Sequence, residues 1–283
     1  MIRHYATVCR ETQVDVLFSS MERHCGAFVL HVLAWDWEPR SVGPGVAVVR
    51  RETFLARHPD YAPERMPGAP RSPINSAVTA RWRFFADLVA DLGQPLTTLD
   101  GDIWFWSSPE PMFEEIGAAR LAVSPHRIPP AKWGRPGATF ETHRKYGLYN
   151  TGFVYLADPA IADELAALNL GWSDTVLRRL PEGRVVFGDQ GWLELVVEKH
   201  GAHVIEHLGV NVAPWNVHAH SFERRDDGQI YVGGQPLVCY HYSSLHLGPD
   251  GSVGQFADPG YAITVGQTQI FYEPYLSVLR AGR

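Results

Sequence analysis

The sequence predicts an α/β fold in which a mainly parallel central sheet is flanked by helices. Short apolar runs alternate with segments of helical spacing along the chain, which is the pattern of successive β-α-β units. The 283 residues are 45% apolar, enough for one large domain with its own core. No internal repeat or linker interrupts them, so we expect one domain over residues 1–283, with its ligand crevice outside the carboxyl ends of the strands.

The first half of the chain opens with a predicted β-α-β unit. Residues 5–8 and the apolar run 28–34 are typical of strands, and the segment 14–21 between them has helical spacing. A further short strand is expected at 46–49, and the Pro-rich stretch 58–73 predicts no regular structure. An amphipathic helix over residues 74–92 should end at Gly93.

The second half continues the alternation from the apolar strand at 96–99, which Pro95 introduces. Strands are expected wherever short runs of β-branched or aromatic residues occur, at residues 121–123, 149–156, 203–206, 230–232 and 237–240. Helical spacing predicts helices over residues 161–180, 190–200 and 274–279.

Charge and composition exclude several classes of protein. The formal charge of −6 and the pI near 6.1 give no electrostatic reason for nucleic acid or an anionic membrane as the main partner. We expect neither a signal peptide nor a membrane span, because the basic and long apolar segments they require do not occur. The three cysteines are too scattered for a disulfide framework, which favours a reducing cytoplasm and buried thiols.

The sequence LDGD at 99–102 is the strongest chemical signal. Two carboxylates, Asp100 and Asp102, leave an apolar strand where a crevice is expected, and hard oxygen ligands suit Mg²⁺ or Mn²⁺. Alternate residues of an extended segment point to opposite sides, so a chelating pair requires a bend, which Gly101 permits. The alternative interpretation is an Asx-rich turn, although apolar flanks on both sides favour a cation.

Three later segments carry further candidate groups. Asn150 precedes a strand and is able either to orient a substrate hydroxyl or to form an Asx turn. Asp189 precedes a helical pattern, where a helix N-cap is the alternative role. His241 ends a strand, and an imidazole beside two carboxylates suits Mn²⁺, whereas an isolated histidine is more often structural.

The long loop 125–147 separates two of the predicted strands and is rich in basic residues. Loops of this length in compact domains are usually functional or disordered, so this segment either closes over a ligand or lies on the solvated surface. Its basic and aromatic residues are His126, Arg127, Lys132, Trp133, Arg135, His143, Arg144 and Lys145.

In this order, the motifs resemble the GT-A glycosyltransferases, and most closely the retaining enzymes of glycosyltransferase family eight. The landmarks span nearly the whole chain: LDGD (99–102), YNTGFVYL (149–156), GDQGWLELV (188–196), APWN (213–216) and CYHYSSLH (239–246). The phrase DIWFWSSPEPMFEEI (102–116) is similar to bacterial glycosyltransferase-like proteins, which indicates a distant bacterial branch. The resemblance implies a GT-A fold and a nucleotide diphosphate sugar as donor.

Carried over by position, the resemblance implies that Asp100, Asp102 and His241 bind Mn²⁺ or Mg²⁺. It also implies that Asp100, with Gly101, lies against the donor, and that Asn150, Asp189 and Gln190 face the transferred sugar.

Two departures from the family pattern concern the donor nucleotide. The first strand ends in Thr7-Val8-Cys9 in place of the family's Asp and Tyr, so Thr7 and Cys9 are the donor-binding candidates there. The family's Lys-Pro-Trp after the terminal His is absent, which leaves His246, Arg81 or Arg83 as groups for the diphosphate.

A mechanism follows from these implied roles. Fixed amide oxygens of Asn150 and Gln190 would favour positive charge on an oxocarbenium-like sugar. Gln190 is a poor nucleophile, so front-face attack by the acceptor and a covalent route through Asp189 are both open routes to retention. The rival functions are a sugar-phosphate nucleotidyltransferase, whose Gly-rich loop is missing after the first strand, and a non-catalytic protein that binds nucleotide sugars or glycans.

Overall fold

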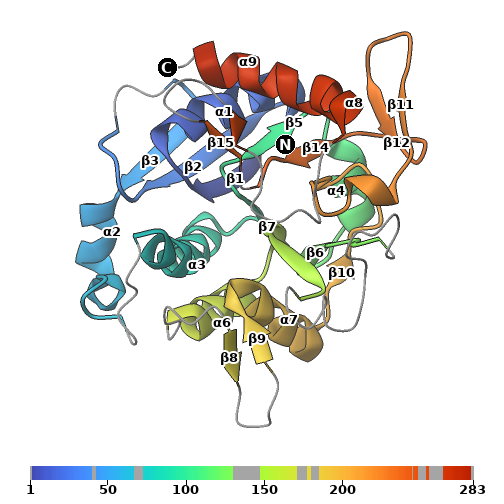
Figure 1. Cartoon of the computed structure of the whole chain (residues 1–283). Coiled ribbons are helices and arrows are strands. Elements are labelled where there is room, and N and C mark those ends of the chain that lie inside the picture. Colours follow the sequence, from blue (N-terminus) through green and yellow to red (C-terminus); the bar gives the residue numbers. More distant parts are fainter. Residues whose placement is uncertain are drawn as a thin grey trace.

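The computed structural model in Figure 1 shows a twisted sheet with helices on both faces. It describes residues 2–39, 43–66, 73–129, 147–170, 177–179, 185–243, 245–247, 253–254 and 264–281. Within these ranges, seven strands form the main sheet in the order β10-β6-β7-β4-β1-β2-β3. They are β1 (Arg3–Val8), β2 (Phe28–Ala34), β3 (Val46–Arg50), β4 (Leu96–Leu99), β6 (Leu121–Pro125), β7 (Tyr149–Leu156) and β10 (His203–Val204).

The direction of β7 distinguishes this sheet from a wholly parallel one. β1 pairs in parallel with β2 and β4, β2 with β3, and β6 with β10, whereas β7 runs antiparallel to both β4 and β6. The predicted mainly parallel sheet is therefore confirmed. Because β7 is reversed, its first residues, not its last, lie at the edge where the parallel strands end.

Helices cover the two faces of the sheet, and each face has its own core. On one face, Tyr5 packs against Leu17 and Met21 of α1 (Glu11–His24). On the other face, Ala6 belongs to the core that includes Trp82 of α3, and the helices there are α3 (Pro73–Leu92), α6 (Pro159–Leu170) and α7 (Gly188–His200). The alternation of β1 residues between the two cores is the period of two expected of a strand buried on both faces.

Local sequence explains where the longer helices begin and end. α1 begins with a capping interaction in which the Gln13 side chain accepts a hydrogen bond from the backbone N–H of Arg10. Gly26 and Gly93 follow α1 and α3 with φ of 63° and 59°. This left-handed conformation ends a helix at little cost only for glycine.

The remaining elements lie around the sheet. They are α2 (Arg51–Arg57), η1 (Pro59–Tyr61), β5 (Ile103–Phe105), α4 (Glu110–Ile116), β8 (Leu177–Arg179), β9 (Val185–Phe187), η2 (Val217–Ala219), β11 (Phe222–Arg224), β12 (Ile230–Val232), β13 (Gln235–Pro236), β14 (Cys239–His241), β15 (His246–Leu247), β16 (Val253–Gly254), α8 (Val265–Gln267), the π-helical turn η4 (Thr268–Tyr272) and α9 (Glu273–Ala281). Across the described ranges, no helix combines the length and hydropathy that crossing a membrane requires.

Several predicted boundaries are wrong. The helix expected over 161–180 ends at Leu170, and Leu177–Arg179 instead forms strand β8, paired with β9. Gly171, which follows Leu170 in the sequence, disfavours continuation of a helix. Helices α2 and α4 were not predicted, because seven residues are too few to establish a helical period. Strand β10 is shorter than the predicted 203–206.

Candidate functional site

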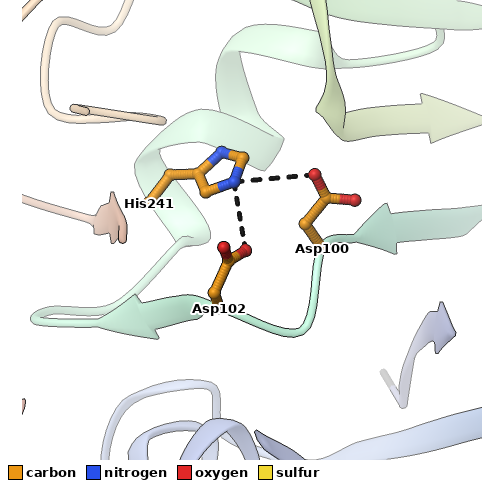
Figure 2. Close-up of side chains that lie close together, drawn as sticks. All are labelled: Asp100, Asp102 and His241. Atoms are coloured by element: carbon orange, nitrogen blue, oxygen red, sulfur yellow. Dashed lines mark ion pairs between the residues drawn. The ribbon is translucent and has the colours of Figure 1, made fainter. Parts of the chain in front are cut away.

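Asp100, Asp102 and His241 converge at the carboxyl edge of the sheet (Figure 2). Nε2 of His241 lies 3.1 Å from Oδ1 of Asp102 and 3.5 Å from Oδ2 of Asp100. One ligand atom from each residue lies within 4.8 Å of the others. The histidine side chain is 3% exposed, and those of Asp100 and Asp102 are 29% and 22% exposed, so the site opens to solvent on the carboxylate side.

Pairing between β5 and β14 brings the histidine to the carboxylates. His241 lies opposite Ile103 in this antiparallel pair, and the N–H of Tyr242 donates to the carbonyl of Asp102 over 2.8 Å. Because β5 begins immediately after the LDGD segment, main-chain hydrogen bonds fix the separation of His241 and Asp102. The two residues are 139 positions apart in the sequence but are neighbours in the fold.

Two glycines provide the space for this arrangement. A Cβ at Gly152 would lie 2.5 Å from Cε1 of His241 and 2.8 Å from Oδ2 of Asp100. A Cβ at Gly101 would lie 2.1 Å from Cβ of Cys9. Gly101 does not have a positive φ, so the turn between the two aspartates requires glycine for close approach to Cys9 and not for a left-handed backbone.

His241 and the two carboxylates carry charges of opposite sign that stabilise one another. Burial raises the pKa of Asp102, but the charge and hydrogen bond of His241 outweigh burial, and the pKa lies below its ordinary value. Burial likewise lowers the pKa of His241, and the two carboxylates raise it by more. Two carboxylates and one imidazole surround the space that a Cβ at Gly152 would fill. These ligands fit Mn²⁺ or Mg²⁺ in donor type and in number.

A second layer of charges lies behind the acidic pair. The guanidinium of Arg81 donates to Oδ1 of Asp100 over 2.6 Å and also to Oδ2 of Asp189. Burial opposes the charge of Arg81, but the two carboxylates outweigh burial and raise its pKa. Asp189 also accepts hydrogen bonds from Nε1 of Trp82 and from the hydroxyl of Thr151. Asp189 lies inside α7 and is buried, so the alternative role of a surface N-cap does not describe it.

Asn150 and Gln190 lie together, but their oxygens are engaged. Oδ1 of Asn150 accepts from the N–H of Gly152 over 2.9 Å and from Nδ2 of Asn211 over 3.1 Å. Nδ2 of Asn150 then donates to Oε1 of Gln190 over 3.1 Å. The expectation from the sequence is that both amide oxygens face the sugar, whereas in the structure two N–H groups occupy the two lone pairs of the Asn150 oxygen.

The other predicted donor-binding residues are placed differently from one another. Thr7 is fully buried within β1, whereas Cys9 is partly exposed beside Gly101. Arg83 pairs with Asp87 and with Asp163 of α6, so of the two candidate arginines only Arg81 contacts the acidic pair. The backbone of His246 lies in β15, but its side chain is outside what the structure describes.

Most of the loop 125–147 also lies outside the described residues, which stop at 129 and resume at 147. Its described beginning is engaged in structural contacts. The guanidinium of Arg127 donates to the carbonyls of Ile205, His207 and Val210, and Nδ1 of His126 lies 3.0 Å from the carbonyl oxygen of Gly147.

Asn211 was not identified as a site residue from the sequence. Its side chain is fully buried and contacts both His241 and Asn150. An asparagine is one of the few residues that tolerate a positive φ, and Asn211 has φ of 55°. The sequence shows an asparagine before a short apolar segment but not the left-handed backbone that directs its side chain into the site.

Sequence comparison finds two uncharacterised relatives from Bacillus subtilis (strain 168). YfnD is 26% identical over 255 residues, which cover 86% of this chain and 78% of YfnD. YfnF is 30% identical over 156 residues, which cover 54% of this chain and 50% of YfnF. No protein-family model matches the chain.

Structure comparison finds the galactosyltransferase LgtC, solved in complex with donor and acceptor sugar analogs. The TM-score is 0.57 at 16% identity, and the match covers 99% of this chain and 96% of LgtC. A structure of an active-site mutant of LgtC matches with a TM-score of 0.51 at 13% identity, over 86% of this chain and 88% of that one. The chain therefore has the GT-A glycosyltransferase fold, as the order of its motifs predicts.

Proposed function

We propose that the chain is a metal-dependent glycosyltransferase, formed as one domain over residues 1–283, that transfers a sugar from a nucleotide diphosphate donor with retention. The observation that carries this proposal is the convergence of Asp100, Asp102 and His241 at the carboxyl edge of a GT-A sheet. This edge is where ligands bind in open α/β folds.

The three converging side chains would hold Mn²⁺ or Mg²⁺. When bound, the ion supplies Lewis-acid stabilisation of the charge that develops on a departing nucleoside diphosphate. The partly exposed carboxylates of Asp100 and Asp102 lie on the solvent side of the site, and the buried His241 lies on its inner side. Arg81 places a second positive charge directly behind Asp100, which limits the repulsion between the carboxylates.

The sugar side of the proposed site presents hydrogen-bond donors. Because Oε1 of Gln190 accepts from Asn150, its amide N–H groups are directed away from that bond and suit the hydroxyl oxygens of a sugar. Asp189 accepts from Arg81, Trp82 and Thr151 at its two oxygens. These bonds stabilise the anion and weaken it as a nucleophile, so of the two retaining routes we favour front-face attack by the acceptor.

The first test is a thermal-shift panel of nucleotide sugars with and without Mn²⁺. A ligand that binds only the native state at about a hundred times its Kd stabilises that state by about 2.7 kcal/mol. We expect Asp102→Ala to abolish the Mn²⁺-dependent part of the shift and to leave the unliganded protein folded. Asp226→Ala is the matched control, because Asp226 lies in the exposed turn between β11 and β12, and it should behave as wild type. An unchanged shift in Asp102→Ala refutes the metal assignment.

Product analysis separates the rival functions. Incubation of a bound nucleotide sugar with Mn²⁺ should release the free nucleoside diphosphate, which is the product of glycosyl transfer or of slow donor hydrolysis. Release of pyrophosphate from a nucleoside triphosphate and a sugar phosphate would identify a nucleotidyltransferase instead. Binding without any turnover would identify a non-catalytic nucleotide-sugar or glycan-binding protein.

A further inference from the structure

Asn211 connects the proposed metal ligand His241 to Asn150 and Gln190, which are proposed to form the sugar side of the site. Its side chain is 0% exposed, between His241 of β14 and Asn150 of β7. A buried amide is costly unless its donors and acceptor are satisfied. The partners that satisfy this amide therefore determine what the residue does.

The backbone holds Asn211 firmly beside β14. The N–H of Val212 donates to the carbonyl of Cys239 over 3.1 Å, and the N–H of His241 donates to the carbonyl of Val212 over 2.7 Å. Nδ2 of Asn216 donates to the carbonyl of Asn211 itself over 3.2 Å. With φ of 55°, these contacts direct the Asn211 side chain towards His241.

The hydrogen bonds of Asn211 have a defined direction. Its Oδ1 lies 3.2 Å from Nδ1 of His241, and a carbonyl oxygen only accepts, so Nδ1 carries the proton. Nε2 lies on the opposite side of the ring, against the carboxylates of Asp102 and Asp100, where a bound metal ion would take the place of a proton on Nε2. The same contact therefore sets both the rotation of the ring and the tautomer that a metal ion requires.

The two N–H groups of Asn211 extend the chain to the sugar side. Nδ2 donates to the hydroxyl of Ser124 over 3.0 Å and to Oδ1 of Asn150 over 3.1 Å. Asn150 in turn donates to Gln190 over 3.1 Å. The directed chain His241 to Asn211 to Asn150 to Gln190 leaves only one orientation for each amide.

We infer that Asn211 is a positioning residue that fixes His241 as a metal ligand and, through Asn150, orients Gln190 towards the donor sugar. The inference rests on the proposed function. Groups that hold a metal-ligating histidine by its second nitrogen typically contribute 10- to 100-fold to metal affinity. Asn211 meets this description by geometry, although it touches neither the ion nor the sugar.

Two substitutions separate a positioning role from a merely structural one, with Mn²⁺ alone as the probe in titration calorimetry. Asn211→Gly removes the side chain but tolerates the positive φ, and it should weaken Mn²⁺ binding about 10- to 100-fold. Asn211→Asp retains an acceptor for Nδ1 of His241 but loses the donor to Asn150, so it should bind Mn²⁺ more tightly than Asn211→Gly does. Asn169→Ala removes an equally buried amide in α6 and should leave Mn²⁺ affinity unchanged.

A double-variant cycle then tests whether Asn211 acts through His241. Adding Asn211→Gly to His241→Ala should cost no further Mn²⁺ affinity, because the contact is already lost. A further tenfold loss in the double variant overturns the inference. So does wild-type affinity in folded Asn211→Gly, while the proposed function stands. Absence of Mn²⁺ binding by the wild-type protein overturns the proposed function itself.

Discussion

Gly152→Ala is the substitution for which the structure gives the most specific expectation. A Cβ at this position would lie 2.5 Å from Cε1 of His241, 2.7 Å from Oδ1 of Asn150 and 2.8 Å from Oδ2 of Asp100. Ordinary contacts of this kind are about 3.5–4 Å, so each neighbour must move by about 1 Å. Two of these neighbours are proposed metal ligands, and the third orients the amide chain.

The loss of stability in Gly152→Ala depends on how far His241, Asn150 and Asp100 are able to move. Forcing one extra carbon into a well-packed site costs about 1–3 kcal/mol of stability. Displacing two of three ligands by about 1 Å should also weaken Mn²⁺ binding at least tenfold, or about 1.4 kcal/mol. The backbone itself does not oppose alanine, because Gly152 has no positive φ.

Titration calorimetry with Mn²⁺ and thermal unfolding with and without Mn²⁺ measure the two effects separately. Gly266→Ala is the matched control, because a Cβ at this exposed position in α8 meets nothing within 4 Å. Alanine there should be neutral or stabilise the protein by up to about 1 kcal/mol. If Gly152→Ala binds Mn²⁺ as tightly as Gly266→Ala does, the arrangement of ligands proposed for this site is wrong.

Two further substitutions test the charges around the site and the fold. Arg81→Met leaves Asp100 and Asp189 without their shared buried cation, so the metal-free protein should lose about 3–5 kcal/mol by denaturant unfolding. Saturating Mn²⁺ should reduce that loss by neutralising Asp100, and an equal loss with and without Mn²⁺ contradicts this reasoning. The carboxylate of Glu115 accepts hydrogen bonds from His203 and from two main-chain N–H groups just after β10. Burial raises the pKa of Glu115, but these hydrogen bonds outweigh burial, and the pKa lies below its ordinary value. Glu115→Gln weakens the same hydrogen bonds. The wild type should be more stable than this variant by about 1–2 kcal/mol at neutral pH. Because the pKa of Glu115 in the folded protein lies below the ordinary 4.5, this advantage in stability should be complete above pH 4.5 and should disappear as the pH falls through the folded pKa. A stability difference between wild type and variant that stays constant from neutral to acid pH refutes this reasoning.

Local sequence was sufficient to predict the strands and helices whose apolar pattern is strong. The run Phe28–Ala34 is a strand with the predicted bounds, and the helix before LDGD ends at Gly93 as predicted. Such elements are fixed by apolar periodicity and by glycines that accept a left-handed φ. The short elements β5 and α4 were not predicted, because they contain too few residues to show a period.

The chemistry of the site was visible in the sequence as residue types in a particular order, but its assembly was not. The sequence determined the two carboxylates at the end of β4, their intervening glycine, and the later asparagine and histidine. Only the tertiary structure decided that β7 is reversed, which brings Asn150 to the same edge as Asp100, and that β14 pairs with β5, which brings His241 to Asp102. Strand direction and pairing between distant segments depend on the packing of the whole sheet. For that reason the directed hydrogen bonds through Asn211 follow from the fold and from no local pattern.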